Sequence, residues 1–389
     1  MKRDVLIVGG AAMGSAVAYY LKSMDSGVSV AVVERDPTYE RSSTVLSDGN
    51  VRIQFNLEEN IRISQYALEV LETFADDMAV GDFRPDVSAR HQGNLFLADE
   101  ERKADALAGM ELQRFLGCEV SWVDGAEIVR RWPVFDGPHH VGGTFGPRDG
   151  SVDPTAVVRG YRHNAAAMGV EYMEAEVDTL LRSDDRIIGV RLAGGDRIAA
   201  PVVINCAGAW SPGLLAGIGV DIPVEPVMRN VFIVESHLEW EDDLPSVFVP
   251  SGLYVLPERD GTFLVGWSRP DDPVGFDFTV RRSKFYDLIW PELVDHFPAF
   301  DQLEIAGSWA GLYAVNTLDG NAILGEWPEV RGLHMCTGFS GHGFQQCHAV
   351  GRYLAELVLE RDHAIDLSRL GPQRIIDGEP LYEHAGRLI

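Results

Sequence analysis

A glycine-rich segment near the N-terminus has the residue types that bind a diphosphate. It reads Gly-Gly-Ala-Ala-Met-Gly over Gly9–Gly14, directly after the apolar run Asp4–Val8 and before a helical stretch, Ser15–Met24. The apolar run is typical of a buried parallel strand. A helix that begins after such a turn presents free N–H groups and the positive end of its dipole to an anion.

An acidic residue at the end of the next apolar run extends this pattern. The run Val28–Val33 predicts a second strand, and Glu34 follows it, 20 residues after Gly14. A carboxylate there accepts hydrogen bonds from ribose hydroxyls. Ala11 stands where the fingerprint has its middle glycine, and its methyl group obstructs the pyrophosphate modestly. We predict a dinucleotide site; a glycine-rich turn without a ligand is the alternative, and the fingerprint suits NAD and FAD alike.

Three further segments carry a resemblance to one family. The segment Glu34–Phe55 resembles the second FAD-binding segment of the D-amino-acid oxidase/sarcosine oxidase superfamily. Cys336–Leu357 resembles its C-terminal flavin motif, and GFSGHGF (Gly338–Phe344) is close to that of monomeric sarcosine oxidases. Val202–Ser211 is similar to the family's strand that ends in an Ala-Gly-Ala-Trp turn. Sarcosine oxidase β-subunit-like proteins and FAD-dependent oxidoreductase domain proteins resemble the chain most.

The resemblance implies FAD as the cofactor, and it implies which residues contact it. These residues come from the glycine turn, the acid, the segment after it, a middle strand and the C-terminal motif: Gly9, Ala11, Ala12, Met13, Gly14, Glu34, Arg35, Ser42, Ser43, Thr44, Arg52, Val177, Ala207, Gly208, Trp210, Gly311, Gly338, Ser340, Gly341, His342, Gly343, Phe344 and Gln345.

The C-terminal motif also has a physical interpretation. Its glycines allow a close backbone approach, and Gly343 begins an amphipathic helix that continues to Leu359. The N-terminus of this helix, aimed at the flavin ring, would stabilise negative charge on the reduced ring. His342 is expected to contact the flavin; a role as catalytic base and a role as an ordinary loop histidine are its alternatives.

The family's chemistry implies the reaction. Its members remove a hydride equivalent from the carbon beside an amine, and water hydrolyses the imine. We therefore expect oxidation of a small secondary or tertiary amine or amino acid that is sarcosine-, N-methyl amino acid- or proline-like. A carboxylate substrate needs a cation, ideally a bidentate arginine. Arg52 is the first candidate, with a surface ion pair as its alternative, and Arg229 and Arg269 are weaker ones. Tyr254 and Trp267 are expected on strands that line the cavity, although either could be plain core.

Three departures from the family refine this expectation. Relatives with cysteine-linked or histidine-linked flavin carry these residues near Gly311 and Leu46 respectively, so we predict non-covalent FAD. Where sarcosine oxidases place lysines near the ring, this chain has Leu264 or Val265 and Gln345. A cation near the reduced ring favours electron transfer to oxygen. We therefore predict a dehydrogenase that passes electrons to a quinone or a flavoprotein. An H2O2-forming oxidase that uses O2 is the alternative.

The elements that must position these residues predict an α/β fold. Helices are expected at 57–74 and from Asp153-Pro154 to about Met168, where the acid caps the helix and proline takes its first position. Strands are expected at 170–179, 186–192, 202–206, 222–235, 254–267 and 306–315, with Gly194-Gly195-Asp196 as a hairpin turn and an interrupted helix at 280–296. The resemblance implies a Rossmann-like FAD-binding domain of the glutathione-reductase-2 type (1–88, 147–216 and 315–370). This domain is interleaved with a mixed, mainly antiparallel substrate domain (89–146 and 217–314) and followed by a tail (371–389).

The composition narrows the possible partners. The chain has 389 residues, of which 46% are hydrophobic and 24% charged, as in globular proteins of two or three domains. Its 33 basic and 59 acidic side chains give a formal charge of −26, which disfavours nucleic acid and anionic membranes as partners. No apolar run reaches the ~18 residues of a membrane span. Four scattered cysteines predict neither a metal site nor a disulfide framework, as in a cytoplasmic enzyme. Two other classes stay open: a non-catalytic flavoprotein of assembly or scaffolding, and an NAD-dependent dehydrogenase.

Overall fold

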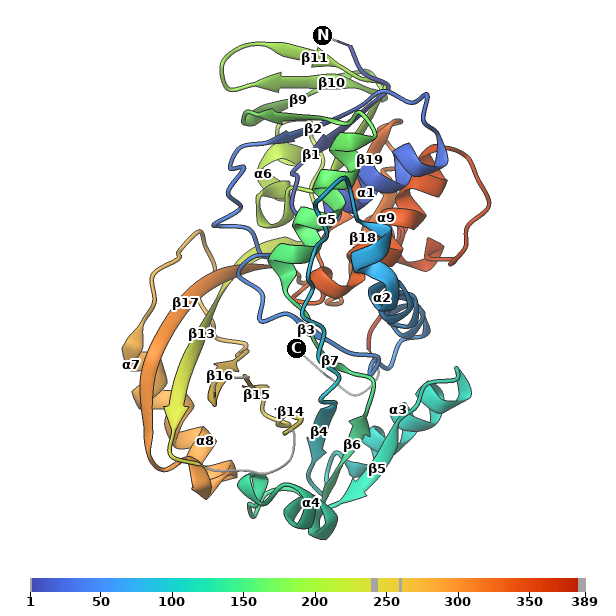
Figure 1. Ribbon diagram of the computed structural model, residues 1–389. Helices are drawn as coiled ribbons and strands as arrows, with labels where there is room; N and C mark the ends of the chain where they lie inside the picture. Colours follow the sequence, from blue (N-terminus) through green and yellow to red (C-terminus); the bar gives the residue numbers. More distant parts are fainter. Residues whose placement is uncertain (1, 239–243, 259–260, 384–389) are drawn as a thin grey trace.

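A six-stranded sheet and an eight-stranded sheet lie at opposite ends of the molecule in the computed structural model (Figure 1). The structure describes residues 2–238, 244–258 and 261–383. Two smaller sheets complete it: a three-stranded one that continues the upper end, and a two-stranded one, β3 (Asn50–Val51) with β7 (Gly150–Ser151), that lies between the large sheets. The mixed α/β fold expected from the sequence is confirmed.

The six-stranded sheet gathers apolar segments from both halves of the chain. Its order is β18-β19-β12-β1-β2-β8, with β18 antiparallel and the other strands parallel. The strands are β1 (Val5–Val8), β2 (Val30–Glu34), β8 (Glu171–Glu174), β12 (Val202–Asn205), β18 (Ile323–Glu326) and β19 (Leu333–Thr337). Val8 pairs with Val33 on one side and Asn205 on the other, so these strands end at one edge. Such an edge is where open parallel sheets bind ligands.

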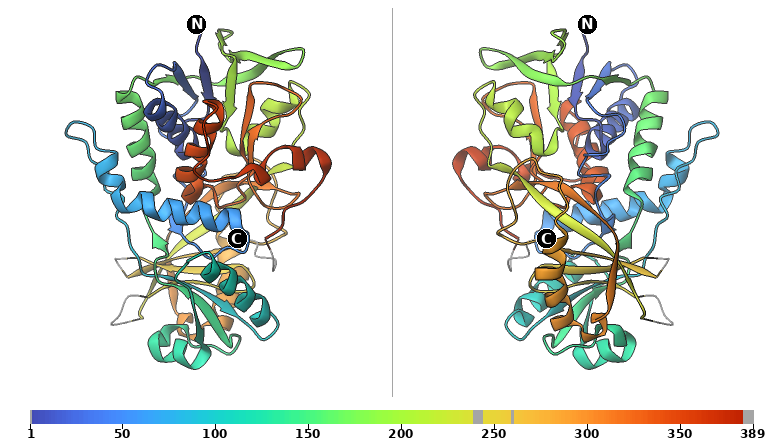
Figure 2. Two further views of the ribbon diagram at one scale, coloured as in Figure 1. Left: turned by 90° about the vertical axis from the view of Figure 1, so that its right-hand side faces the viewer. Right: turned by 90° about the vertical axis from the view of Figure 1, so that its left-hand side faces the viewer.

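Helices cover one face of this sheet. Helix α1 (Ala12–Met24) packs between α5 (Pro154–Ala167) and α9 (Gly343–Val358), and α2 (Glu58–Asp77) packs against α9 (Figure 2). Asp153 caps α5 as predicted, because its carboxylate accepts hydrogen bonds from the N–H groups of Thr155 and Ala156. The predicted helix from Gly343 is also present, with His342 immediately before it.

The three-stranded sheet contains one departure from the sequence expectation. Its antiparallel strands are β9 (Val177–Ser183), β10 (Arg186–Leu192) and β11 (Arg197–Ala199), and the glycine hairpin lies between the last two as predicted. The single strand expected over 170–179 is wrong. The chain instead leaves β8 after Glu174 and enters β9, in a different sheet, at Val177. Tertiary pairing decides this break, because the sequence there has neither glycine nor proline.

The eight-stranded sheet is mixed and mainly antiparallel, as the resemblance implied. Its order is β17-β13-β16-β15-β14-β4-β6-β5, and β14 with β4 is the parallel pair. The strands are β4 (Asn94–Ala98), β5 (Ser121–Asp124), β6 (Gly142–Gly146), β13 (Val224–Ser236), β14 (Ser246–Phe248), β15 (Leu253–Pro257), β16 (Thr262–Trp267) and β17 (Leu303–Asn316). The long strands β13 and β17 curve together from the helical end of the molecule to the far end (Figure 1).

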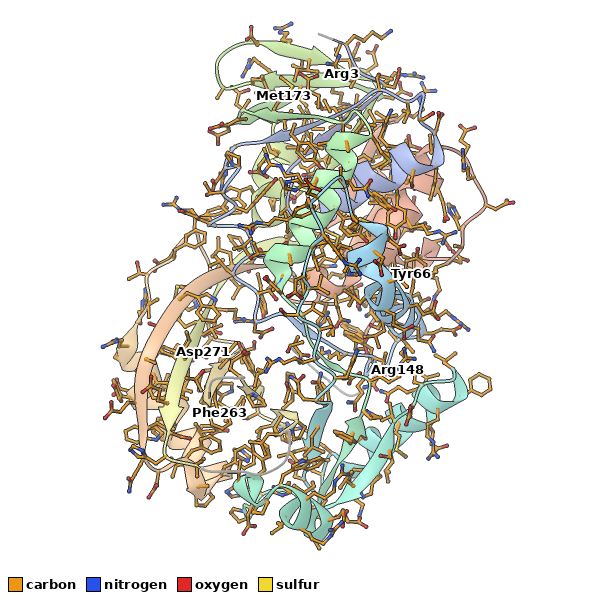
Figure 3. All side chains as sticks on the ribbon, viewed as in Figure 1. Arg3, Tyr66, Arg148, Met173, Phe263 and Asp271 are labelled. Atoms are coloured by element: carbon orange, nitrogen blue, oxygen red, sulfur yellow. The ribbon has the colours of Figure 1, made fainter. Side chains whose placement is uncertain are left out.

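The two faces of this sheet have different neighbours. One face carries a buried cluster that includes Phe232, Phe263, Phe285 and Phe297 and packs under α7 (Arg282–Lys284) and α8 (Trp290–His296). Figure 3 labels Phe263 in this region, far from Arg3 and Met173 at the other end. The other face carries a smaller cluster of Phe96, Val231, Phe248, Tyr254, Leu256 and Leu264. That second face borders the candidate site.

The helix expected over 280–296 differs in its detail. A π-helical turn, Phe285–Ile289, separates α7 from α8, and Pro291 lies in the first turn of α8. Proline has no N–H to donate, so the chain widens before it and continues, where an interruption was expected at the proline itself. The remaining helices are α3 (Lys103–Phe115), α4 (Gly125–Arg131), α6 (Ser211–Ala216) and α10 (Gln373–Asp377).

An ion pair and a hydrogen bond hold the C-terminal segment against the helical end of the molecule. The buried Arg374 on α10 forms an ion pair with buried Asp319 at 2.9 Å. Asp319 also accepts a hydrogen bond from the N–H of Leu381. Residues 384–389 of the predicted tail lie outside the described residues. The domain boundaries themselves stay a prediction, which the sheet membership of the strands supports.

None of the helices in the described ranges has both the length and the apolarity needed to span a bilayer. The cytoplasmic location stays a prediction.

Candidate active site

A cavity of about 1530 Å³ extends from the strand edge of the six-stranded sheet to the eight-stranded sheet. Residues after β1, β2 and β12 line it at one end, among them Gly9, Glu34 and Ala207. Residues of β13, β15 and β17 line the other end, among them Arg229 and Tyr254. Figure 1 shows these two groups of strands on either side of the centre of the molecule. One cavity can therefore hold a long ligand and a small one next to it.

The glycine turn is shaped by close backbone contacts. Gly9 has a φ of +96°, and a Cβ atom there would lie 2.5 Å from the carbonyl oxygen of Cys206. A Cβ atom on Gly14 would lie 1.9 Å from the carbonyl oxygen of Gly9. Both positions therefore require glycine. Ala11 precedes α1 and has no side-chain group that caps it, so the first N–H groups of the helix meet the cavity where a diphosphate fits.

Glu34 is held in place by the same turn. One carboxylate oxygen accepts a hydrogen bond from the N–H of Gly10 at 2.8 Å, and the other accepts one from the N–H of Asp36 at 2.9 Å. A carboxylate has about four acceptor sites, so the Glu34 side chain, which lines the cavity, retains capacity for ribose hydroxyls. Next to it, the Arg35 guanidinium stacks over Trp210 at 4.0 Å and closes that end of the cavity. These residues fit the adenosine part of FAD.

The segment 42–46 and strand β17 form the middle wall. The Ser43 hydroxyl donates to the carbonyl oxygen of Leu312 at 2.6 Å, and the Ser42 hydroxyl accepts from the N–H of Val45. A Cβ atom on Gly311 would lie 3.1 Å from Cβ of Leu46. The two positions where covalent relatives attach their flavin are thus adjacent, and both line the cavity without a nucleophile.

This wall leads to a prediction on cofactor attachment. We expect acid precipitation of the purified protein to release its yellow flavin into the supernatant, because Gly311 and Leu46 cannot form a bond to the ring. The thiol of Cys336, which also lines the cavity, is a poor substitute because burial raises its pKa well above the usual value. Flavin colour that stays with the precipitated protein would contradict the prediction.

The C-terminal motif closes the cavity opposite this wall. Gly341 has a φ of +102°, and a Cβ atom there would lie 2.5 Å from the ring of Tyr313. His342, at the start of α9, meets the ring of Phe55 edge-on with 5.1 Å between centroids. His342, Gly343 and the next two residues line the cavity. A helix N-terminus therefore points at the site, as the sequence predicted.

Gln345 has a structural task in addition to lining the cavity. Its side-chain oxygen accepts the Arg52 N–H at 2.7 Å, and its amide nitrogen donates to the Arg52 carbonyl at 3.1 Å and to Ser64 at 2.9 Å. Both ends of this buried amide are therefore used to fix the backbone of Arg52. In related oxidases we expected a lysine here, and the structure shows what the glutamine does in its place.

The Arg52 guanidinium lies among aromatic rings. Its central carbon is 4.6 Å from the ring of Phe55, 5.2 Å from Phe96 and 5.9 Å from Phe248, which are cation–π distances. Burial lowers the pKa of Arg52, and the nearby carboxyls of Glu383, Asp149 and Asp48 oppose this effect. Arg52 stays a cation at neutral pH, since an arginine does not lose its proton in proteins. The surface alternative for Arg52 is therefore wrong, because only 7% of the residue is exposed.

Around Arg52 lie Tyr254, which was a candidate in the sequence, and two ionisable side chains that were not predicted, Asp48 and Tyr313. Asp48 lines the cavity, and removal from bulk water raises its pKa, although the hydrogen bond from the Asn50 N–H, the charge of Arg52 and the nearby Tyr254 hydroxyl oppose this. Burial also raises the pKa of Tyr254 well above its usual value and that of Tyr313 to about 12. Both tyrosines therefore carry their protons at neutral pH and can act as donors.

Arg229, a weaker candidate in the sequence, also lines the cavity. Its guanidinium forms an ion pair with the buried carboxylate of Asp272 at 2.5 Å and lies 5.1 Å from the ring of Tyr313. Lys284 binds the other oxygen of Asp272. The carboxylate of Asp272 thus partly neutralises the positive charge of Arg229. The signal for this triad is absent from the sequence, because its members come from β13, from the loop after β16 and from α7, and only tertiary packing brings them together.

The structure does not bring every expected residue to the cavity. Of the residues that the sequence assigned to the cofactor or to catalysis, all except Ala12 and Gly338 line it within the described ranges. Ala12 faces the packed helices, and Gly338 packs against Asn316 and Val224. Four further residues lie elsewhere. Leu264 and Val265 belong to the core, the Trp267 indole N–H donates to the carbonyl oxygen of Ser251, and Arg269 pairs with exposed Asp271.

Asp149 lies behind Arg52 and gives a prediction on pH. Its buried carboxyl accepts from the Ile53 N–H and the Gln54 side chain, both at 2.9 Å, yet burial raises its pKa from 3.8 to about 7. The folded state thus binds this proton more tightly than the unfolded state, so Asp149 lowers the free energy of unfolding as pH rises from about 4 to 7. Between pH 5 and 8 this loss is roughly 3 kcal/mol.

The Asp149→Asn variant tests this contribution. We expect the free energy of unfolding, measured by urea titration at several pH values, to fall less steeply over that window than in the wild type. Other titrating groups are common to the two proteins and cancel in the difference. Parallel pH profiles of the two proteins would show that Asp149 ionises normally.

Comparison with known proteins shows which family and which relatives this chain is similar to. A family model described as FAD dependent oxidoreductase matches residues 4–357. FAD-dependent oxidoreductase domain-containing protein 1 of Bos taurus is 33% identical over 424 residues, covering 98% of this chain and 87% of that protein. Monomeric sarcosine oxidase from a Bacillus species is 26% identical and covers 94% of this chain and 94% of that protein. The crystal structure of L-proline dehydrogenase from P. horikoshii superposes with a TM-score of 0.87 at 25% identity, covering 98% of this chain and 99% of that one.

Proposed function

The chain belongs to the FAD-dependent oxidoreductase family that includes sarcosine oxidase, and from this premise we propose that it oxidises the C–N bond of a small secondary or tertiary amine or amino acid to an imine. The family is FAD-dependent and acts on amines and amino acids. The substrates proposed for this chain are sarcosine-, N-methyl amino acid- or proline-like. Its similarity to L-proline dehydrogenase supports a secondary amine.

One observation carries the proposal. The cavity continues past the glycine turn and the C-terminal motif to a smaller end lined by Arg52, Tyr254 and Phe248. A cation, a hydroxyl donor and an aromatic wall are the groups that hold a small carboxylate with an apolar side chain. A protein that only binds FAD has no need of this combination of groups beside the cofactor part of its cavity.

The side chains at this end suggest how a substrate is held. Bound FAD supplies an acceptor for the hydride equivalent that leaves the carbon beside the amine. Arg52 binds the substrate carboxylate, and its backbone is fixed by Gln345 so that the guanidinium keeps its position. Phe55, Phe96 and Phe248 exclude water around the guanidinium, which strengthens the ion pair.

The charges in the cavity favour a dehydrogenase. None of the four lysines, all of which lie in the described residues, lines the cavity. Of the arginines that line the cavity, Arg52 and Arg229 lie at its substrate end, and both have carboxyl neighbours that reduce the positive potential there. A weaker positive potential stabilises developing superoxide less, so electrons pass to a quinone, a flavoprotein or a dye in preference to O2.

The proposal is tested by measuring turnover of sarcosine, L-proline, pipecolate and N-methylated amino acids with two acceptors. We expect at least one amine to reduce a quinone analogue or a redox dye much faster than it consumes oxygen. Faster oxygen consumption with equimolar H2O2 would identify an oxidase, for which Arg229 is the available cation. Turnover of no amine with either acceptor would favour the non-catalytic alternative, an assembly or scaffold flavoprotein.

A further inference from the structure

The loop before Arg52 places one carboxyl in the substrate end of the cavity. Asp48 is half-buried in the cavity wall, and one of its oxygens accepts the N–H of Asn50 at 3.1 Å. The Tyr254 hydroxyl from β15 lies close to the carboxyl. The backbone hydrogen bond fixes the direction of this side chain, which stays open to the cavity that it lines.

The charged and titratable groups that the described residues place near Asp48 come from several elements. Arg52 follows on the same segment, Tyr254 lies on β15 and Tyr313 on β17. Arg229 on β13 lines the same cavity, and the carboxyl of Asp272 partly neutralises it. Both tyrosines are protonated at neutral pH, so neither accepts a proton there, whereas a carboxylate at Asp48 can. Its own pKa is raised, which makes the carboxylate a stronger base than an exposed aspartate.

The proposed substrate brings the complementary group. A secondary amine or amino acid is an ammonium ion at neutral pH, and an ammonium cannot lose a hydride from the adjacent carbon, because its nitrogen lone pair is occupied by the proton. A substrate whose carboxylate pairs with Arg52 carries its ammonium within one or two bonds of that carboxylate. Asp48 lies near Arg52 and lines the same cavity, so its carboxylate can accept a proton from this ammonium.

We infer that Asp48 is the catalytic base that takes the proton from the substrate ammonium, so that the site is specific for amines that carry a carboxylate. The N–H bond breaks, its proton passes to a carboxylate oxygen of Asp48, and its electron pair stays on nitrogen. Bound FAD would supply the acceptor for the hydride of the adjacent carbon, and the nitrogen lone pair that Asp48 has freed would form the C=N bond of the iminium product. The proton leaves Asp48 for water when the product dissociates. This inference rests on the proposed function.

The test uses the FAD-loaded full-length protein and measures flavin reduction by rapid mixing without oxygen. L-proline and sarcosine are the probes. In the Asp48→Asn variant we expect the reduction rate at neutral pH to fall about 100-fold or more, as for loss of a general base. The rate should rise tenfold per pH unit towards high pH, because only substrate that is already neutral reacts. Asp48→Glu should restore part of the rate, and Asp271→Asn, at an exposed carboxyl, should change nothing.

A binding measurement separates this role from a structural one. Tetrahydrofuran-2-carboxylate has the shape and carboxylate of proline but an uncharged oxygen in place of the ammonium. Its affinity, read from the flavin spectrum, should change less than about threefold in Asp48→Asn, whereas a collapsed site would bind it much more weakly.

The outcomes distinguish the two proposals. If a probe reduces the wild-type flavin, and flavin reduction in Asp48→Asn has the same pH profile as in the wild type, the role of Asp48 is overturned. The proposed function then still stands. Equal loss of tetrahydrofuran-2-carboxylate binding and of reduction also overturns it, since the residue would then be structural. A wild-type flavin that neither probe reduces, at any pH, overturns both.

Discussion

Gly14→Ala is expected to purify with little or no FAD. The added Cβ atom would lie 1.9 Å from the carbonyl oxygen of Gly9, which is backbone and cannot swing away. The start of α1 must therefore move away from the turn, so that its free N–H groups no longer point at the diphosphate. A displacement of this kind costs about 3 kcal/mol or more, so we expect FAD affinity to fall at least ~100-fold. Flavin absorbance per protein and titration of the apoprotein with FAD measure it.

A glycine in the same cavity provides the matched control. Gly213, on α6, also lines the cavity, but a Cβ atom there meets no atom within 4 Å. Gly213→Ala should keep its FAD and be slightly more stable, because alanine favours a helix. Circular dichroism of Gly14→Ala separates loss of FAD from loss of the fold. A folded Gly14→Ala protein with full flavin content would show that the diphosphate does not use this turn.

Arg52→Met is expected to lower kcat/KM for a carboxylate-bearing amine by roughly 30- to 150-fold, with little change for pyrrolidine, which has no carboxylate. A charge-assisted hydrogen-bonded pair of this kind contributes about 2–3 kcal/mol. Methionine fits the apolar space that Phe55, Phe96 and Phe248 form around the guanidinium. Arg52→Lys keeps the charge but loses the planar fork, so an intermediate loss of about tenfold is expected.

Arg269→Met serves as the control for this prediction. Its guanidinium pairs with exposed Asp271 and does not reach the cavity within the described residues. Steady-state kinetics of the variants with L-proline and with pyrrolidine give the comparison. If Arg52→Met lost activity equally on both amines, Arg52 would support the fold of the site without binding a carboxylate.

The cofactor end of the molecule was predictable because its signals are local. Gly9, Gly14 and Glu34 lie within one short segment, and each has a defined task in the turn. Asp153 predicted the start of its helix because it caps the N-terminus of that helix. The resemblance in the C-terminal motif added FAD, which the N-terminal pattern alone did not distinguish from NAD.

The substrate end was less predictable because long-range pairing creates it. Arg229 stands opposite Gly311 only through the register of β13 with β17. Asp48 followed by glycine has the sequence of an ordinary turn. Its surroundings come from Tyr254 and Tyr313, more than 200 residues later in the chain. A sequence pattern that covers neighbouring residues carries no information about such an encounter.

Amine oxidation is tested most directly by anaerobic titration of the FAD-loaded protein with sarcosine, L-proline, pipecolate, N-methylated amino acids and D-amino acids, followed by the absorbance of oxidised flavin. We expect at least one secondary amine with a carboxylate to bleach the flavin fully, and its ester or decarboxylated analogue to do so far more slowly. Flavin that keeps its oxidised spectrum with every amine would contradict amine oxidation and favour a protein that binds FAD without oxidising amines.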